Sequence, residues 1–191
     1  MNPNKNPKCK ELAERCDYEL IKIAKECNEG YVLYKVATRC DKCAQYLVSG
    51  LLMIGVNANA TYKKRPILRW ALEMADSEPL HAVPIAWYLV IYGADPNTRD
   101  SKGNTLLHYT ARHCFIFKEL VEDLLDRGAN PNIRNKRGET PLHILIKYGK
   151  CTDDYKAEVA RILLKYGADP HIRDKDGKTP FDYTNDTIAK I

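Results

Sequence analysis

The feature that most constrains the fold is a sixteen-residue pattern that occurs three times in the second half of the chain. Its central copy, at residues 128–143, reads GANPNIRNKRGETPLH. The copies at residues 93–108 and 167–182 read GADPNTRDSKGNTLLH and GADPHIRDKDGKTPFD. A degraded copy begins at Gly55, so the first glycines, at positions 55, 93, 128 and 167, are spaced by 38, 35 and 39 residues. A period of this length predicts a stack of similar structural units.

Each position of the pattern has a physical role. The first glycines follow apolar runs, where a helix ends readily in a left-handed conformation that glycine adopts without steric cost. A second glycine ten residues later predicts another positive φ, so the two bracket a protruding hairpin. The threonines that follow are expected to be N-caps of the next helix, with proline at the first helical position in two copies. These residues are Thr105, Thr140, Thr179, Pro141 and Pro180.

The turn, the Thr-Pro-Leu-His segment and the two helical runs in each unit resemble the ankyrin repeat. The resemblance covers Tyr31 to about Ile191 and is strongest after Gly93. It implies an all-α repeat solenoid, in which helix-turn-helix units are joined by β-hairpin fingers. It also implies that His108 and His143 make hydrogen bonds between neighbouring repeats. The loop insertions are similar to those of stand-alone ankyrin proteins in large DNA viruses and intracellular bacteria.

The periodicity of apolar residues divides the chain into successive segments. We expect a disordered lead-in at residues 1–10, a capping helix at 11–30, repeats at 31–58, 59–96, 97–131 and 132–170, and an incomplete C-terminal cap at 171–191. One face of the capping helix would carry Leu12, Cys16, Leu20, Ile23 and Cys27, with residues 28–30 ending the helix. The repeat register places the later helices at residues 31–37, 44–54, 66–75, 82–92, 106–113, 118–127, 141–148 and 155–166.

The apolar positions of the last two long helices predict part of the core. Helical spacing relates Val121, Leu124 and Leu125, and likewise Val159, Ile162 and Leu163. The segment at residues 59–65 lacks the second glycine of the pattern, so the sequence leaves its conformation open.

Composition excludes some classes of protein. The longest apolar runs are too short to span a bilayer, so no transmembrane helix is expected. The first residues lack the apolar core of a secretory signal. Seven cysteines, an odd number without paired spacing, favour a reducing compartment, the cytoplasm or nucleus.

Few residue groups offer catalytic or metal chemistry. Cys40 and Cys43 form a close pair, but a zinc site needs two further ligands, and the nearest histidine pair, His108 and His113, falls in a helix that the repeat explains. His113 and Cys114 are adjacent, yet a thiol nucleophile needs a positioned base and an orienting group. There is no glycine-rich phosphate loop and no hydrolase or zinc-protease motif. We therefore expect a non-enzymatic protein without catalytic residues, metal or cofactor.

The resemblance implies a concave face, made of finger tips and inner helices, that binds another protein. Arg99, Arg134 and Arg173 occupy one equivalent position and should form a ladder along the fingers. Tyr62 and Tyr148 are candidate anchors. The predicted partner-binding residues are Arg99, Lys102, Arg112, Arg134, Lys136, Arg137, Lys147, Tyr148, Arg173, Lys175 and Lys178. Because arginine binds carboxylates in a bidentate manner, a partner with an acidic surface is expected.

The function expected from these features is that of an adaptor or a sequestering inhibitor. The net charge of +5 is modest, and Asp100, Glu139, Asp174 and Asp176 interleave with the basic residues, so the fingers can also be solvated loops with local ion pairs. Nucleic-acid binding through the fingers is a weaker alternative because no row of aromatic residues accompanies them. A further alternative is an effector or immune-signalling inhibitor of a virus or intracellular bacterium.

Overall fold

The computed structural model describes residues 11–12, 19, 21, 27, 29–39 and 44–184. Its contacts divide the chain into two compact units, Met1–Asp95 and Pro96–Ile191, named unit 1 and unit 2. The predicted lead-in and most of the capping helix lie outside the described residues. Of the face predicted for that helix, Leu12 and Cys27 are described and both are buried.

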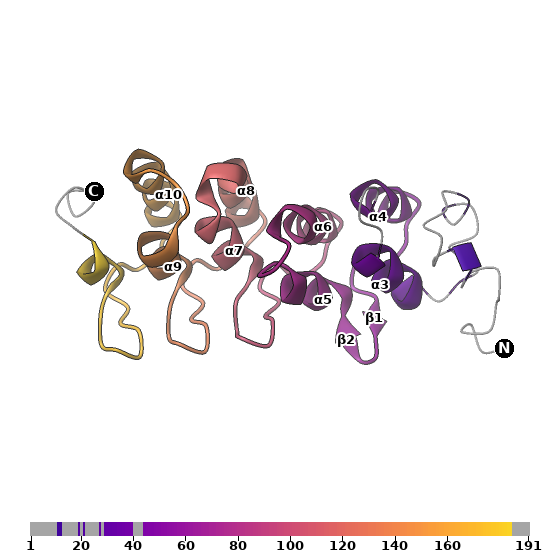
Figure 1. The fold of residues 1–191 in the computed structure, drawn as a ribbon, viewed down its shortest axis with the longest axis horizontal. Helices are drawn as coiled ribbons and strands as arrows, with labels where there is room; N and C mark the ends of the chain where they lie inside the picture. The colour runs from indigo at the N-terminus through magenta and orange to yellow at the C-terminus, as the bar shows by residue number, and fades with distance from the viewer. Residues whose placement is uncertain are drawn as a thin grey trace. The chain divides into compact units, whose positions relative to one another are not determined.

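Unit 1 contains two helix pairs and a short hairpin (Figure 1). The helices are α3 (Glu29–Arg39), α4 (Ala44–Met53), α5 (Ile67–Met74) and α6 (Pro79–Ile91). Within each pair the helices pack on each other, and α3 also packs on α5 and α4 on α6. The strands β1 (Thr61–Tyr62) and β2 (Arg65–Pro66) pair antiparallel between the two helix pairs.

Unit 2 repeats the arrangement with longer loops. Its elements are α7 (Leu106–Arg112), α8 (Cys114–Asp126), α9 (Pro141–Tyr148), α10 (Asp153–Lys165) and the 3-10 helix η3 (Pro180–Tyr183). The inner helices α7 and α9 pack side by side, and η3 packs on α9. The outer helices α8 and α10 pack on each other and on α7 and α9 respectively. Three loops, here called fingers, project from the same side of the inner helices at residues 96–104, 130–139 and 169–178 (Figure 1).

The turn chemistry expected from the repeated pattern is confirmed. Gly128, just after the C-terminal end of α8, has φ of 87°, and Gly138, near the tip of the finger that follows, has φ of 77°. The equivalent glycines of the other copies also have positive φ. Thr105, Thr140 and Thr179 are the N-caps of α7, α9 and η3, each in a reciprocal capping box with the residue three positions on.

The predicted core is confirmed with one exception. Val121, Leu124 and Leu125 of α8 and Val159 and Leu163 of α10 are buried. Ile162 is only half-buried, so its assignment to the core is wrong. Among the described residues no outer helix follows α10, because η3 is a single short turn, so no described helix packs on the far side of α10 from α8.

Two predicted helix boundaries are wrong for physical reasons. Glu29 and Gly30 begin α3 instead of ending a capping helix. A Cβ at Gly30 would overlap the carbonyl oxygen of Thr61, so the glycine lets β1 approach the start of α3. Helix α6 begins at Pro79, three residues before the predicted start, because proline suits the first helical turn.

The second helix of the third repeat is broken in two. The sequence placed it at residues 118–127, whereas α8 begins at Cys114. Phe117 inside it has non-helical angles, with φ of −119° and ψ of 23°, so a first turn is separated from the predicted helix by a kink. The remaining helices differ from the prediction by up to two residues at their ends.

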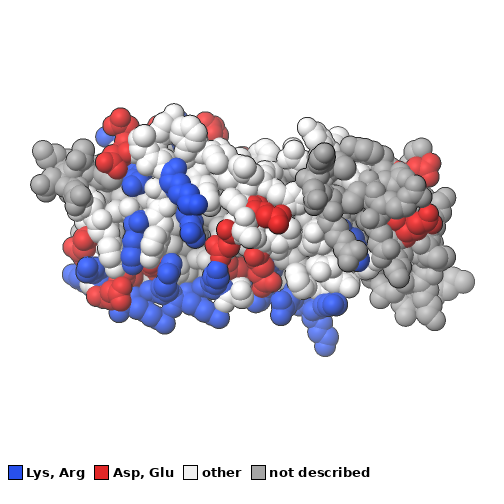
Figure 2. Space-filling model, in the orientation of Figure 1, with Lys and Arg blue, Asp and Glu red and all other residues white. Residues whose placement is uncertain are grey.

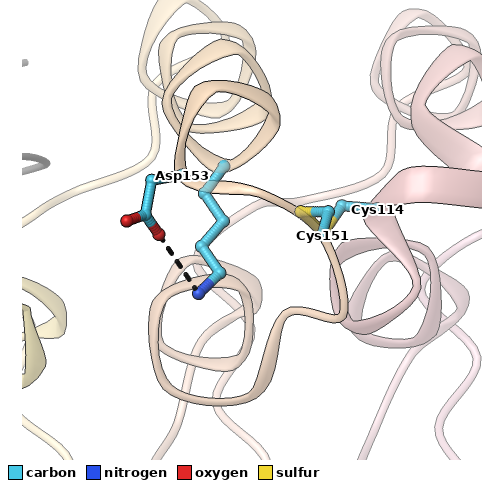
Figure 3. Close-up of a disulfide and its surroundings, with 4 residues drawn as sticks. Cys114, Cys151 and Asp153 are labelled. Atoms are coloured by element: carbon cyan, nitrogen blue, oxygen red, sulfur yellow. Dashed lines mark ion pairs between the residues drawn. A yellow bond between two sulfur atoms is a disulfide. The ribbon is translucent and has the colours of Figure 1, made fainter.

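The expectation that the cysteines are all reduced is wrong. Cys114, at the start of α8, forms a disulfide with Cys151, in the loop before α10 (Figure 3). Cys27 in unit 1 is disulfide-bonded as well. Disulfides persist mainly in oxidising compartments, so these bonds remove the reason for expecting the cytoplasm or nucleus. Within the described residues, no helix is both long and apolar enough to cross a membrane.

The disulfide fixes the insertion of the fourth repeat to the third. The amide of Lys150 donates a hydrogen bond of 2.8 Å to the carbonyl of Arg112, beside the bonded cysteines. A Cβ at Gly149 would lie 3.3 Å from the Cys114 sulfur and would overlap the carbonyl oxygen of Leu145. The inserted loop therefore lies against the corner between α7 and α8.

Candidate functional site

Each finger of unit 2 is closed by a buried side chain that accepts hydrogen bonds from its own backbone. Asp100 Oδ1 accepts from the amides of Lys102 and Asn104, both at 2.8 Å. Asn135 and Asp174 take the same place in the next two fingers. All three side chains are buried. Asp100 therefore shapes the finger from within, and it is not one of the surface acids that the sequence suggested.

The arginine ladder, formed by Arg99, Arg134 and Arg173, joins successive fingers. Nε of Arg99 donates to the carbonyl of Gly103 at 3.2 Å, and Nε of Arg134 donates to that of Gly138 at 3.1 Å. The terminal NH2 of Arg99 then donates to the backbone carbonyl of Arg134, and that of Arg134 donates to the carbonyl of Arg173 at 2.9 Å. The predicted ladder is present, and its guanidinium groups bind the protein's own backbone.

Backbone hydrogen bonds connect the same fingers. The amide of Lys136 donates to the carbonyl of Lys102 at 2.9 Å, and the amide of Lys175 donates to the carbonyl of Arg137 at 3.0 Å. At Gly138 an added Cβ would lie 3.0 Å from the Lys175 nitrogen, so the next finger packs directly on this glycine. The three fingers of unit 2 are thus one hydrogen-bonded row.

A buried carboxylate anchors the inner side of the row. The Glu139 side chain is 1% exposed, and its oxygens lie 2.9 Å from Arg137 Nε and 3.2 Å from Lys147 Nζ. Tyr148 donates its hydroxyl to the same carboxylate at 3.2 Å. Burial alone would raise the pKa of Glu139, but its hydrogen bonds with Asn135 and Lys147 and the charge of Arg137 hold that pKa below its usual value.

Lys147 lies inside this network. Its ammonium is 4.1 Å from the centre of the Tyr183 ring and 5.3 Å from that of Tyr148. Burial lowers the pKa of Lys147, yet the contacts with Tyr183, Tyr148 and Glu139 outweigh burial and raise it. Lys147 therefore connects the fourth repeat to the last one, whereas the contacts of Tyr148 lie within the fourth repeat. Whether either residue also contacts a partner stays a prediction.

The two repeat histidines have the role implied by the resemblance. His108 Nε2 lies 3.2 Å from the Glu139 carbonyl oxygen, and His143 Nε2 lies 3.1 Å from that of Lys178, in each case in the following repeat. Nδ1 of each histidine accepts a hydrogen bond from the amide of its capping threonine. Burial lowers the pKa of His108 from 6.5 to about 4, although the bond to the Glu139 carbonyl opposes the shift. Burial lowers the pKa of His143 in the same way.

The remaining predicted lysines lie on the fingers, where Lys and Arg side chains gather in unit 2 (Figure 2). Lys102, Lys136 and Lys175 are exposed, and Lys178 is exposed with its ammonium 5.0 Å from the centre of the Tyr183 ring. Neither Lys136 nor Lys175 forms an ion pair with another described residue. Arg112 is half-buried at the end of α7. The tips of unit 2 therefore carry positive charge on a backbone that its neighbours hold in place.

Unit 1 contains an aromatic group that the sequence analysis identified only at Tyr62. The Tyr62 ring, on β1, stacks on Tyr34 of α3 with centroids 4.3 Å apart, and Trp70 of α5 meets Tyr34 edge to face at 4.9 Å. Tyr31 also meets Tyr62 edge to face, at 5.9 Å. The three-residue spacing of Tyr31 and Tyr34 on a helix was the available signal, because such residues share a helix face.

Cations accompany these rings on the hairpin and on α3. The cation–ring pairs are Lys35 with Tyr31, Lys63 with Tyr62 and Arg65 with Trp70, at 5.6, 5.4 and 5.3 Å. Lys63 and Lys64, at the hairpin tip, are both exposed and have positive φ of 50° and 61°. The hairpin is thus a second site at which basic side chains project from a fixed backbone.

The candidates for metal or catalytic chemistry fall elsewhere. Cys40 and Cys43 lie outside the described residues. In the part of the chain that the structure describes, no three His, Cys, Asp or Glu side chains are grouped to hold a metal ion. Cys114 is bonded to Cys151, and the buried His113 ring lies edge to face with Phe117 at 6.4 Å. The disulfide removes the Cys114 thiol from the nucleophile candidates.

Comparison with known families agrees with this geometry. Residues 80–174 match the family model described as ankyrin repeats, in three copies. The chain is an ankyrin-repeat protein, and ankyrin repeats are general modules for binding other proteins. No curated protein sequence matches the chain. The family match begins within α6, so the surface of the hairpin and of α3 in unit 1 is defined by the structure alone.

Proposed function

We propose that this protein is a non-enzymatic adaptor or sequestering inhibitor that binds an acidic surface of a partner protein through the finger tips of unit 2. The observation that carries the proposal is the pair Lys136 and Lys175. Both side chains are exposed without a described ion pair, while the backbone amide of each donates to the preceding finger. Two positive charges are therefore held one repeat apart on an ordered backbone, which lowers the entropy cost of binding.

The other predicted contacts fall into two groups. Lys102, Lys178 and Arg137 extend the basic tips. Arg99, Arg134 and Lys147 also join neighbouring repeats, and Arg173 and Tyr148 make hydrogen bonds within their own repeats. Any partner contact of these side chains therefore involves groups that also stabilise the fold. Reversing charge at the ladder would disturb the fingers, and loss of binding in such a variant would have two explanations.

The test is therefore a pull-down from nuclease-treated cell lysate with the intact protein and with a Lys136→Glu, Lys175→Glu variant. Both side chains are exposed, so we expect the variant to keep its helical content and unfolding temperature. We expect it to lose the specific proteins that the intact chain captures, because charge reversal repels an acidic surface. A Lys150→Glu, Arg161→Glu variant, with the same change in net charge at exposed positions away from the fingers, should retain them.

If both variants capture the same proteins as the intact chain, the finger tips are not the binding surface. A parallel pull-down omits the nuclease. If the intact chain captures proteins only from the untreated lysate, it binds them through the phosphate backbone of nucleic acid and the proposal is wrong.

A further inference from the structure

The hairpin tip of unit 1 carries lysine where glycine and asparagine are the favoured residues. Two-residue hairpin turns with positive φ at both central positions strongly prefer Asn-Gly, because most side chains are strained there. Lys63 and Lys64 occupy these two positions, with φ of 50° and 61°. They are the only non-glycine residues with positive φ in the described part of the chain. Strained backbone of this kind is concentrated at functional sites.

Compared with Asn and Gly, lysine at this tip adds a positive charge on a long side chain. Both ammonium groups are exposed, and neither is ion-paired with another described residue. The Lys63 ammonium lies 5.4 Å from the centre of the Tyr62 ring, and this cation–π contact restricts its position. The strained positions are therefore occupied by two positively charged residues, neither of which pairs with a carboxylate of the described chain.

The hairpin is fixed to the rest of unit 1. Gly30 lets the Thr61 carbonyl approach the first turn of α3, and the Tyr62 ring stacks on Tyr34 of that helix. On the other side, Trp70 Nε1 donates to the Tyr62 carbonyl at 3.4 Å, and the Arg65 guanidinium lies 5.3 Å from the centre of the Trp70 ring. The positive charges consequently have a defined position before any ligand arrives.

We infer that these six residues, Tyr34, Tyr62, Lys63, Lys64, Arg65 and Trp70, form a second binding surface, specific for an acidic peptide segment of a protein partner. We call it the aromatic–basic cluster. All six residues belong to unit 1, so the cluster shares no residue with the finger tips of unit 2. Lys63 and Arg65 lie over the half-buried rings of Tyr62 and Trp70, and Lys64 is exposed beside them in the sequence. This composition matches that of protein-binding hot spots, in which tyrosine, tryptophan and arginine predominate. Carboxylate side chains along an extended peptide are the complementary charges.

The contacts within the cluster favour a peptide over a single-stranded nucleic acid. Binding of nucleic-acid bases requires ring faces on which they can stack. The Tyr62 ring already stacks on Tyr34 and carries Lys63, and Trp70 contacts Tyr34 and Arg65.

The test exploits the strain at the tip. A Lys63→Asn, Lys64→Gly variant of the full chain has the residues that this turn prefers, so it should unfold at the same or a higher temperature while lacking both charges. Its affinity for a fluorescein-labelled oligoglutamate peptide, measured by fluorescence anisotropy, should fall about tenfold, the change that corresponds to about 1.4 kcal/mol. Loss of binding in a variant at least as stable as the parent cannot be attributed to unfolding.

Three further samples make the result specific. A Lys63→Arg, Lys64→Arg variant keeps the charge and should bind as the parent does. A Lys63→Gln, Lys64→Gln variant removes the charge without relieving the strain and should lose affinity to the same extent. A Lys150→Gln, Arg161→Gln variant removes two exposed charges elsewhere and should bind normally.

Three outcomes overturn the inference: unchanged peptide affinity in the Asn-Gly variant, equal loss in the Lys150 and Arg161 control, or tip-dependent binding of an oligothymidylate in preference to the peptide. The Lys136→Glu, Lys175→Glu variant separates this surface from the proposed function. If it alone loses the peptide, unit 2 is the acidic-ligand site and the inference fails. If the Asn-Gly variant alone loses it, the aromatic–basic cluster is the site.

Discussion

The hairpin of unit 1 and the fingers of unit 2 hold basic side chains in place by different means. The fingers depend on their neighbours, since each is joined to the next by an arginine guanidinium and a backbone hydrogen bond. The hairpin is a two-stranded ladder that pairs Thr61 with Pro66 and Tyr62 with Arg65, and aromatic rings fix it to α3 and α5.

This difference separates stability from binding in the two units. In unit 2 the fold uses the guanidinium groups of Arg99 and Arg134, which is why we propose Lys136 and Lys175 as the partner contacts. In unit 1 the fold would be served better by Asn and Gly at the hairpin tip, yet lysines stand there. Repeat position alone consequently does not show which basic side chains the fold itself uses.

The largest effect should come from the disulfide that reinforces unit 2. It closes a loop with a sequence separation of 37 residues, for which chain entropy predicts about 4 kcal/mol of stabilisation. A Cys151→Ser variant should lower the free energy of unfolding of unit 2 by roughly that amount in chemical denaturation. Signals from Trp70 and Trp87 report on unit 1 and should change much less. Equal destabilisation of both units would show that their stabilities are not separate.

The second-largest effect should be a loss of stability of unit 2 at acidic pH. The pKa of His108 is about 4 in the folded state and 6.5 in the unfolded state, so below pH 6.5 the unfolded chain binds the proton more readily. The stability that neutral His108 provides is present above pH 6.5 and is lost as the pH falls toward 4, by about 3 kcal/mol in all. His143 acts in the same direction.

Urea denaturation of unit 2 between pH 7.5 and pH 4.5 measures this loss, with the pH values chosen to span the His108 shift. A His108→Gln variant should be less stable at pH 7.5 but should show a shallower pH dependence. An unchanged slope in that variant would exclude His108 as the source.

Because the fingers approach each other closely at Gly138, an alanine there should destabilise the protein more than an alanine at Gly128. Gly138→Ala places a methyl group 3.0 Å from the Lys175 nitrogen and 2.8 Å from the Arg134 guanidinium, at a φ of 77°. We expect a loss of about 2 kcal/mol in the free energy of unfolding. Gly128→Ala has a similar φ of 87° but meets nothing within 4 Å, so it should cost about 1 kcal/mol, the backbone strain alone. Equal losses would mean that the fingers do not pack as described.

The smallest effect should distinguish two members of the ladder. Arg134 donates to its own finger and to the next one, whereas Arg173 donates only within its finger, to Gly177 at 2.7 Å, among the described residues. Arg134→Lys should lower the unfolding free energy by about 1 kcal/mol because an ammonium cannot make both bonds. Arg173→Lys should cost clearly less. Thermal unfolding at matched pH compares the two, and a larger effect at Arg173 would contradict the ladder.

The sequence predicted most of the fold because the repeat determines local structure. The glycines fixed the turns, the threonines fixed the helix starts, and the apolar spacing fixed the buried faces. It failed at Cys114 and Cys151, which are far apart in the chain and meet only because the inserted loop folds back onto the preceding repeat. It also missed the start of α3, because the need for Gly30 comes from Thr61 in the following hairpin.

The candidate site was less predictable from the sequence. The equivalent positions of Arg99, Arg134 and Arg173 predicted a ladder, but only geometry shows that the guanidinium groups bind backbone carbonyls. Glu139 reads as an ordinary loop acid, although it is 1% exposed and contacts two cations. These features depend on contacts between repeats, which the spacing of residues within one repeat does not specify.

The most direct test of the hydrogen-bonded row is amide hydrogen exchange at Lys136 and Lys175. These two amides donate to the carbonyls of Lys102 and Arg137 in the preceding finger. The structure predicts that both are protected to an extent comparable with amides of α7 and α9, and that Arg134→Lys reduces the protection at Lys175. Exchange of both amides at the rate of an unstructured chain would show that the fingers are independent loops and would contradict the account of unit 2.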